Sequence, residues 1–239
     1  MSDDVLLDAR AVSKRFGGLA ALRDVDVVQR RGETLGMIGP NGSGKTTFVN
    51  VITGHLAMNG GTVRFAGESL DGRSPFRIAR AGLTRTYQSV RIFGELSGGE
   101  NVATALVDAR DPVDPDGIAE LADWLKIGHR LDVPAGGLKL DEQRRLELLM
   151  RLVQRPRLVM LDEPVGGLSS TEVRIMIGLL AELKARCTLF VIEHTMKVIR
   201  ELADKVVVLV AGEKLAEGPP AEILADQRVI DFYLGSADA

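Results

Sequence analysis

Aromatic side chains are scarce in this sequence, at 4% of its 239 residues. Proteins that bind single-stranded nucleic acid use such side chains as stacking platforms, so their scarcity argues against that class. Positive charge is not in excess either, because the formal net charge is −3. Binding to duplex DNA normally requires a clustered basic surface. We therefore expect no nucleic-acid partner.

Cysteine and long apolar segments are equally scarce. The single cysteine, Cys187, lies in the apolar run CTLFVI, so we expect a small buried core residue and a reducing compartment. The N-terminal MSDDVLLDAR is acidic and lacks the apolar centre of a signal peptide. The longest apolar run, VVVLVAG at 206–212, is too short to span a bilayer. We expect a cytoplasmic protein that other subunits would have to hold at a membrane.

Short apolar runs alternate with amphipathic segments through most of the chain. Runs without polar alternation indicate strands covered on both faces, as in a mainly parallel sheet between helices. The strands expected on this basis cover 6–12, 24–29, 34–39, 62–67, 157–162, 187–192 and 205–212. The expected helices run from the end of GSGKTT to about 54 and over 141–153, 170–185 and 195–203.

The strand pattern stops between about 89 and 137. This region carries DARDPVDPDG and then the amphipathic IAELADWLKIGHRL, which together predict a small helical lobe inserted in the α/β core. The strands around 62–67 look more like an antiparallel flank. We thus expect one domain over 1–239, with a core at about 1–88 and 138–239 and the helical lobe at about 89–137.

The most specific motif is GPNGSGKTT at 39–47, which follows an apolar run and opens a predicted helix. Its glycines let backbone N–H groups point at a β-phosphate, and the helix start adds partial positive charge. Lys45 would place its ammonium on the β- and γ-phosphates, and the Thr46 hydroxyl would ligate Mg²⁺. A purely structural glycine turn would not require Lys-Thr at this offset. The motif predicts a P-loop that binds ATP and Mg²⁺ through Gly39, Pro40, Asn41, Gly42, Ser43, Gly44, Lys45, Thr46 and Thr47.

A second motif, RLVMLDEP at 157–164, completes the expected site. Its apolar residues predict a buried strand that delivers Asp162 and Glu163 at its carboxyl end, where open α/β sheets bind ligands. Asp162 is the expected partner of Mg²⁺ through water, and Glu163 can polarise the attacking water as general base. Alone, such an acidic pair is more often solvated surface, and the phosphate loop upstream is what favours catalysis.

Together these motifs resemble the nucleotide-binding domain of the ABC ATPases, over essentially the whole chain. The resemblance implies an ABC-type P-loop fold and ATP hydrolysis. Gln88 in GLTRTYQSV matches the Q-loop glutamine, which touches the metal and the water and faces the transport subunit. His194 in FVIEHT matches the switch histidine at the γ-phosphate, and Phe16 in SKRFGGLAAL matches the aromatic residue that stacks on adenine. Outside this context both would be taken as structural residues.

Finer matches are similar to the ATPase subunits of branched-chain amino acid importers. They include SKRFGGLAALRDV, TRTYQSVRIF, EQRRLELLMRL and the tail RVIDFYLG. The resemblance implies transmembrane permease subunits, a second ABC ATPase subunit and indirectly a solute-binding protein as partners, with the chain peripheral on the inner face of the cell membrane. The helical lobe is shorter than in the larger ATPase type of these importers, so the solute stays open between branched-chain amino acids and a similar small polar solute.

ELSGGEN at 95–101 looks like the signature with which one ABC subunit binds its partner's nucleotide, but it lies too early in the chain. We expect its glycines to form a turn at the entry to the helical lobe, with Glu100 and Asn101 opening a helix. The family's signature instead begins the helix that runs toward RLVMLDEP. Alignment on EQRRLE places in that slot Leu138, Lys139, Leu140, Asp141 and Glu142.

The substitutions in this signature slot predict a weak signature. An intact signature offers a serine hydroxyl, glycine N–H groups and a free helix N-terminus to the γ-phosphate. Lys139 stands at the serine position and Asp141 at the second glycine. We expect Asp141 to cap the helix and to repel a phosphate, since two unit charges about 4 Å apart repel by roughly 4 kcal/mol at an effective dielectric of 20. Alternatively, Asp141 and Glu142 only stabilise the helix start.

The sequence therefore predicts an ATP-hydrolysing importer subunit suited to asymmetric pairing with a paralogue; a homodimer would have two impaired sites. The alternative is a nucleotide-binding regulatory or structural module with little turnover. Glu163 and His194 favour the first reading, because a pure binding module has no chemical need for both. An ABC ATPase that acts on DNA or ribosomes is a weaker third option, since such proteins usually carry tandem domains or long inserted arms.

Overall fold

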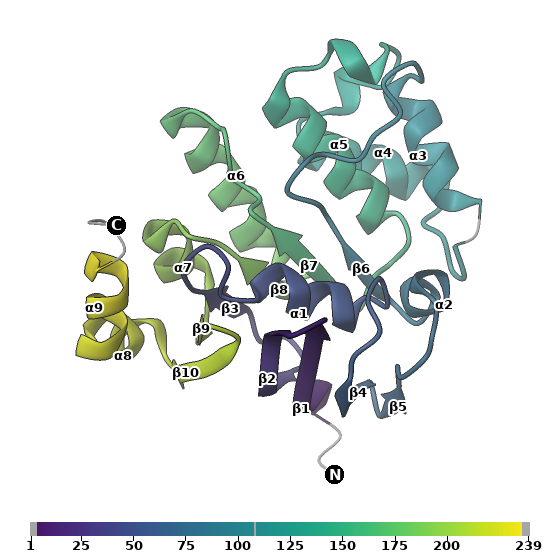
Figure 1. Cartoon of the computed structure of the whole chain (residues 1–239). Helices are drawn as coiled ribbons and strands as arrows, with labels where there is room; N and C mark the ends of the chain where they lie inside the picture. The colour runs from purple at the N-terminus through teal and green to yellow at the C-terminus, as the bar shows by residue number, and fades with distance from the viewer. Residues whose placement is uncertain (1–3, 108, 236–239) are drawn as a thin grey trace.

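Two β-sheets with helices between and around them form the described part of the chain, residues 4–107 and 109–235, in the computed structural model (Figure 1). The larger sheet has six strands in the order β10-β9-β3-β8-β7-β6. Neighbours from β9 to β6 pair in parallel, and β10 is antiparallel to β9. Its strands are β3 (Leu35–Ile38), β6 (Leu83–Arg85), β7 (Leu158–Asp162), β8 (Thr188–Ile192), β9 (Lys205–Val210) and β10 (Glu213–Gly218).

The smaller sheet is antiparallel and has four strands in the order β2-β1-β4-β5. Its strands are β1 (Val5–Phe16), β2 (Leu19–Arg30), β4 (Gly60–Phe65) and β5 (Glu68–Ser69). Helix α1 (Lys45–Ile52) packs between the two sheets, because Phe48 and Val49 share one apolar cluster with strands of both. Phe48 stacks on Phe190 of β8, with ring centroids 6.3 Å apart. Figure 1 shows α1 above the purple β1 and β2.

The central strands are buried on both faces, which explains their lack of polar alternation. Leu158 and Met160 of β7 belong to the apolar cluster around α1. Val159 and Leu161 of the same strand belong to a second cluster with the helices on the other face. Successive side chains of a strand point to opposite faces of the sheet. The side chains on both faces must therefore be apolar when both faces are covered.

Most of the remaining helices cover the second face or form the helical lobe. The longer ones are α3 (Gly98–Leu106), α4 (Pro115–Trp124), α5 (Leu140–Leu152), α6 (Ser170–Leu183) and α9 (Gln227–Gly235). The shorter ones are α2 (Pro75–Arg80), α7 (Met196–Leu202) and α8 (Pro220–Ala225), with 3₁₀ turns at Gly128–Arg130 and Ala135–Gly137. None of the helices in the described residues is long and apolar enough to cross a bilayer.

Helices α3 and α4 both contact α5, and Figure 1 shows these three teal helices together. One apolar cluster continues from Val102 of α3 through Leu149 of α5 to Leu180 of α6 and Val191 of β8. The lobe is therefore joined to the core by shared packing. The division into a core at about 1–88 and 138–239 and a lobe at about 89–137 stays a prediction.

The predicted fold class is confirmed: a mainly parallel sheet, an antiparallel β flank and a helical insertion are all present. Three strands were not predicted. β5 and β6 span two and three residues, too few to show a pattern. β10 reads EKLAEG, which is polar because the strand lies at the edge of the sheet.

Candidate functional site

The loop at 39–47 joins β3 to α1, at the carboxyl end of the parallel strands. Gly39 has a φ of 154° and lies so close to β9 that an added Cβ would be 2.1 Å from Leu209 O. Gly44 has a φ of 103°, and its added Cβ would be 2.7 Å from Ala21 O. These glycines allow the tight turn that a side chain would block. Along the rest of the loop Ser43 is buried, Pro40 and Thr47 are half-buried, and Asn41, Gly42 and Thr46 are exposed.

The start of α1 lacks the caps that close other helices. Its N-cap is Gly44, with no side-chain cap hydrogen bond and no acidic residue in the first turn. In α3, α5 and α6, by contrast, Glu100, Glu142 and Glu172 each accept a hydrogen bond from the N-cap N–H. Because the first N–H groups of a helix have no partner inside it, the start of α1 suits an anion from outside.

Lys45 is buried beneath this loop. Its Nζ donates to Gly39 O at 2.7 Å and to Pro40 O at 2.9 Å. Burial lowers the pKa of Lys45, while the carboxylates of Glu163 and Asp162 raise it. The phosphate loop and the acidic pair at the end of β7 are therefore close enough to interact.

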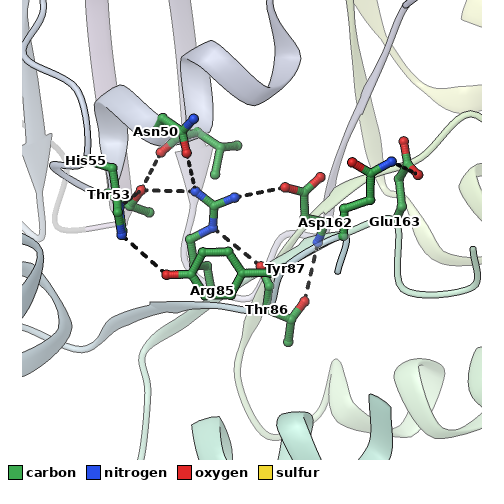
Figure 2. Close-up of polar contacts among 10 residues, drawn as sticks. Asn50, Thr53, His55, Arg85, Thr86, Tyr87, Asp162 and Glu163 are labelled. Atoms are coloured by element: carbon green, nitrogen blue, oxygen red, sulfur yellow. Dashed lines mark hydrogen bonds and ion pairs between the residues drawn. The ribbon is translucent and has the colours of Figure 1, made fainter. Parts of the chain in front are cut away.

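Asp162 ends β7 and is buried. Its Oδ2 accepts a hydrogen bond from Arg85 Nη2 at 2.9 Å (Figure 2). Burial raises the pKa of Asp162, and the Arg85 guanidinium opposes this shift. The pair joins two residues that are 77 positions apart in the sequence, because β6 and β7 are neighbours in the sheet.

Glu163, Gln88 and His194 come together beside Asp162. Glu163 has a φ of 50°, a strained conformation for a residue with a side chain, and strain of this kind clusters at functional sites. Gln88 Nε2 donates to Glu163 Oε2 at 2.9 Å, and His194 Nδ1 lies 3.7 Å from Glu163 Oε1. Gln88 and His194 are exposed and Glu163 is half-buried, so the carboxylate lies at the surface of the chain.

The side chains around the phosphate loop fit a hard divalent cation. Thr46 offers a hydroxyl and Asp162 a carboxylate oxygen. Gln88 uses its amide nitrogen for the hydrogen bond to Glu163, so its amide oxygen can face a cation. Oxygen donors of these kinds are the ones that Mg²⁺ prefers.

Phe16 lies at the end of β1 with 47% of its surface exposed. Lys14 Nζ lies 5.2 Å from the centroid of its ring. An exposed ring at a strand end is available for stacking, as a residue that contacts adenine must be, whereas a core phenylalanine would be buried.

Two buried residues at the site were not among the predicted ones. Arg85 is described above. Glu193 is fully buried, and its carboxylate accepts hydrogen bonds from the backbone N–H groups of Val165 and Thr195 at 3.3 and 3.2 Å. It thus ties the segment after Glu163 to the segment after His194. A glutamate directly after the apolar run LFVI was a signal that could have identified it.

The signature slot begins α5, as expected, but its cap differs from the prediction. The N-cap residue is Lys139, so the expectation that Asp141 caps the helix is wrong. Asp141 is the second helical residue and its carboxylate pairs with Arg145, while Glu142 Oε2 accepts the Lys139 N–H at 2.9 Å. Leu138 is buried, whereas Lys139 and Leu140 are exposed.

ELSGGEN leads into α3, where Ser97, Glu100 and Asn101 have structural partners. Ser97 is the N-cap and forms a capping box with Glu100. Asn101 is fully buried, accepts a hydrogen bond from Phe93 N–H and donates one to Phe93 O, at 2.8 and 2.9 Å. The expected turn at Gly98 and Gly99 is wrong in detail, because both are the first helical residues of α3. The hydrogen bonds of Ser97, Glu100 and Asn101 show that this LSGGE segment forms the start of a helix.

Comparison with known proteins identifies the family of the chain. The profile of the ABC transporter family matches residues 22–166, and that of the branched-chain amino acid ATP-binding cassette transporters matches residues 213–239. The chain is 35% identical to the high-affinity branched-chain amino acid transport ATP-binding protein BraF of Pseudomonas aeruginosa, over 97% of this chain and 98% of that protein. It is 36% identical to LivG, of the same description, from Salmonella typhimurium, with the same coverage.

Solved structures show the same fold. The ADP conformation of MJ1267, an ATP-binding cassette of an ABC transporter, superposes with a TM-score of 0.87 at 27% identity, covering 97% of this chain and 99% of that one. The chain therefore belongs to the ABC transporter family and is an ATPase. The predicted resemblance to ATPase subunits of branched-chain amino acid transport is confirmed.

Proposed function

We propose that the chain is the ATP-binding and ATP-hydrolysing subunit of an importer for branched-chain amino acids or a similar small polar solute. The observation that carries this proposal is the cluster at the carboxyl ends of β3, β6, β7 and β8. There Gln88 and His194 flank Glu163, and Lys45 lies within electrostatic reach of Glu163 and Asp162. The relatives named as branched-chain amino acid transport proteins support the solute class.

In the proposed site, the phosphates of ATP bind the loop 39–47 and the start of α1, and adenine stacks on Phe16. Thr46, Asp162 and Gln88 hold Mg²⁺, which neutralises phosphate charge when bound. Glu163 takes the proton of the attacking water. His194 and Gln88 flank this carboxylate and orient the reacting groups.

A groove of about 600 Å³ beside the Q-loop suits a permease segment. Its lining includes Phe76 and Phe93, which are 48% and 57% exposed. Tyr87, the neighbour of Gln88, also lines it, so an occupant would sit next to the site. Most of its charged residues are basic, namely Arg80, Arg91, Arg110, Arg151, Arg155 and Arg157 against Asp111. A cytoplasmic segment with apolar and acidic side chains would fit, and would hold the chain at the inner face of the membrane.

The proposal includes asymmetric pairing with a second ABC ATPase subunit. The slot Leu138–Glu142 lacks the serine and the second glycine that would contact a partner's γ-phosphate, whereas the chain's own loop and Glu163 match the family. A paralogue with a complete signature would then give one competent and one impaired site. The alternative function is a nucleotide-binding regulatory module, and its support is the same incomplete slot.

The test is ATP hydrolysis by the purified chain alone and by the complex that co-purifies with it from membranes. We expect Mg²⁺-dependent ATP binding, permease and paralogue subunits in the complex, and turnover well below about 1 s⁻¹ for the chain alone, where enzymes of this class reach about 1–10 s⁻¹. Turnover at that rate by the chain alone would contradict asymmetric pairing. A chain that binds ATP but whose complex hydrolyses none would favour the regulatory module, and Glu163→Gln is the inactive control.

A further inference from the structure

Arg85 lies at the centre of a buried polar network that connects Asp162 to the groove (Figure 2). Its side chain is 6% exposed and that of Asp162 is 7% exposed. The guanidinium uses different nitrogens for different partners: Nη2 donates to Asp162 Oδ2 at 2.9 Å and Nη1 to Asn50 Oδ1 at 2.6 Å. Nε donates to Thr86 O at 3.4 Å. The planar fork is therefore fixed in orientation, and it fixes the carboxylate.

The same guanidinium also lies over an aromatic ring that reaches the groove. Its central carbon is 4.5 Å from the Tyr87 ring centroid, and that of Arg91 is 4.8 Å from the same centroid. Tyr87 and Arg91 both line the groove. Figure 2 shows the Tyr87 ring beside the Arg85 guanidinium, with the Tyr87 hydroxyl directed toward His55. A segment that packs against Tyr87 would thus contact a ring that contacts Arg85.

We propose that Arg85 is a positioning residue: with Tyr87 it holds the Asp162 carboxylate in place for Mg²⁺ and links that carboxylate to the occupant of the groove. The proposal rests on the proposed function, because it takes Asp162 as the metal-side carboxylate. Arg85 contacts Asp162 through Oδ2 and leaves Oδ1 for the metal shell. The pair Arg85 and Tyr87 acts as a unit because each restricts the position of the other.

The test compares Arg85→Lys with the wild-type protein. Lysine keeps the positive charge, so the net charge beside Asp162 is unchanged, but a single ammonium cannot contact Asp162, Asn50 and the Tyr87 face together. Binding of a fluorescent ATP analogue is measured in EDTA and during a MgCl₂ titration, without turnover. We expect unchanged binding in EDTA and a half-saturating Mg²⁺ concentration about tenfold higher, the order expected for one lost charge-assisted hydrogen bond.

Tyr87→Leu provides a second and independent variant. It leaves the buried ion pair in place and removes the ring together with its hydroxyl, which contacts His55. This variant provides the test if Arg85→Lys does not fold. We expect its Mg²⁺ requirement to shift in the same direction by a smaller factor, and the double variant to show less than the product of the two shifts, because the residues act together. Arg186→Lys is the matched control, since Arg186 lies 4.7 Å over the Trp124 ring without contacting the site, and we expect it to match the wild type.

Each outcome separates this inference from the proposed function. If the wild-type chain does not bind the ATP analogue, the proposed function fails. If it binds with a Mg²⁺ requirement that Arg85→Lys and Tyr87→Leu leave unchanged or lower, Arg85 does not position Asp162 and only the inference is overturned. Shifts that multiply fully in the double variant would overturn the link through Tyr87.

Discussion

The Asp141 carboxylate pairs with the Arg145 guanidinium one turn further along α5. Arg145 also donates to Lys126 O at 2.8 Å, which holds this pair against the helical lobe. The charge that a partner's γ-phosphate would meet is therefore largely compensated within the chain. On the proposed pairing, the slot would be weak because it lacks the serine hydroxyl and carries the side chains of Leu140 and Asp141 at the glycine positions, more than because Asp141 repels a phosphate.

Restoring the slot should raise the activity of the chain alone. The double variant Lys139→Ser with Asp141→Gly supplies a hydroxyl at the serine position and removes the side chain from the position of the second glycine. We expect ATP turnover to rise by about tenfold, which corresponds to about 1.4 kcal/mol, the order of one hydrogen bond to a charged group. The measurement is phosphate release at saturating ATP.

A matched assay uses the same double variant in a Glu163→Gln background, which separates dimerisation from hydrolysis. ATP should then produce a dimer that gel filtration detects. If neither turnover nor ATP-driven dimerisation increases, the slot does not limit the chain and the asymmetric pairing loses its basis.

The LSGGE at 96–100 should affect stability without affecting catalysis. Ser97→Ala removes the capping box of α3 and should lower the free energy of unfolding by about 1 kcal/mol, measured by urea denaturation. Turnover of the co-purified complex should not change. Ser74→Ala is the control, because Ser74 is the N-cap of α2 but makes no side-chain cap hydrogen bond. A large loss of turnover in Ser97→Ala would return this segment to the candidates for a signature.

The phosphate loop should not tolerate a side chain at Gly39. A Cβ there would lie 2.1 Å from Leu209 O and 3.1 Å from Leu209 C, which are backbone atoms that cannot move alone, and 2.7 Å from Ser43 Oγ. We expect Gly39→Ala to cost at least about 3 kcal/mol of stability and to abolish ATP binding. Gly67→Ala is the control: Gly67 has a φ of 85° but open space around it, so only strain of about 1 kcal/mol applies. Similar losses in the two variants would show that crowding by β9 is unimportant.

The site residues that the chain's own pattern predicts belong to short contiguous motifs, whereas Gln88 and His194 were identified only through the family resemblance. The loop 39–47 and the pair at 162–163 could be predicted because each is set by a strand, a turn and a few adjacent residues. Arg85 could not, since its partner Asp162 is 77 positions away and β6, which carries it, has three residues. Asp141 was expected to cap the helix because aspartate is among the preferred N-cap residues. In the structure α5 begins at Leu140, and Glu142 accepts the N–H of the N-cap residue Lys139.

Cys187 should report unfolding. It is half-buried, rather than fully buried as predicted, yet burial raises the pKa of its thiol to about 12. The reactive form is the thiolate, so at pH 8 the folded protein should react with a disulfide reagent far more slowly than the protein in urea, where the thiol has an ordinary pKa. Labelling rates with and without urea measure the difference. Rapid labelling of the folded chain would contradict the shift.

His55 should make the protein less stable below neutral pH. Burial lowers the pKa of His55, and the nearby guanidinium groups of Arg85 and Arg91 lower it further. Thr53 Oγ1 uses its proton on Val49 O, so His55 Nδ1 must donate to it, and Nε2 then accepts from the Tyr87 hydroxyl. Protonation of His55 would turn Nε2 into a donor, so Nε2 could no longer accept the hydrogen bond from the Tyr87 hydroxyl.

The sign of the pH effect follows from which state binds the proton more readily. Unfolded His55 has the higher pKa, so its contribution to stability is fully present above about pH 6.5 and is lost as pH falls through the lower, folded pKa. Burial raises the pKa values of Glu147 and Glu193. Their contributions to stability are therefore present at low pH and are lost as pH rises. The informative quantity is therefore the difference in unfolding free energy between wild type and His55→Gln, measured from pH 7.5 to 5.5. We expect wild type to lose its advantage on acidification, and Tyr87→Phe, which retains His55, to keep most of the wild-type dependence. A difference that is constant across this range would show that His55 does not titrate with a lowered pKa.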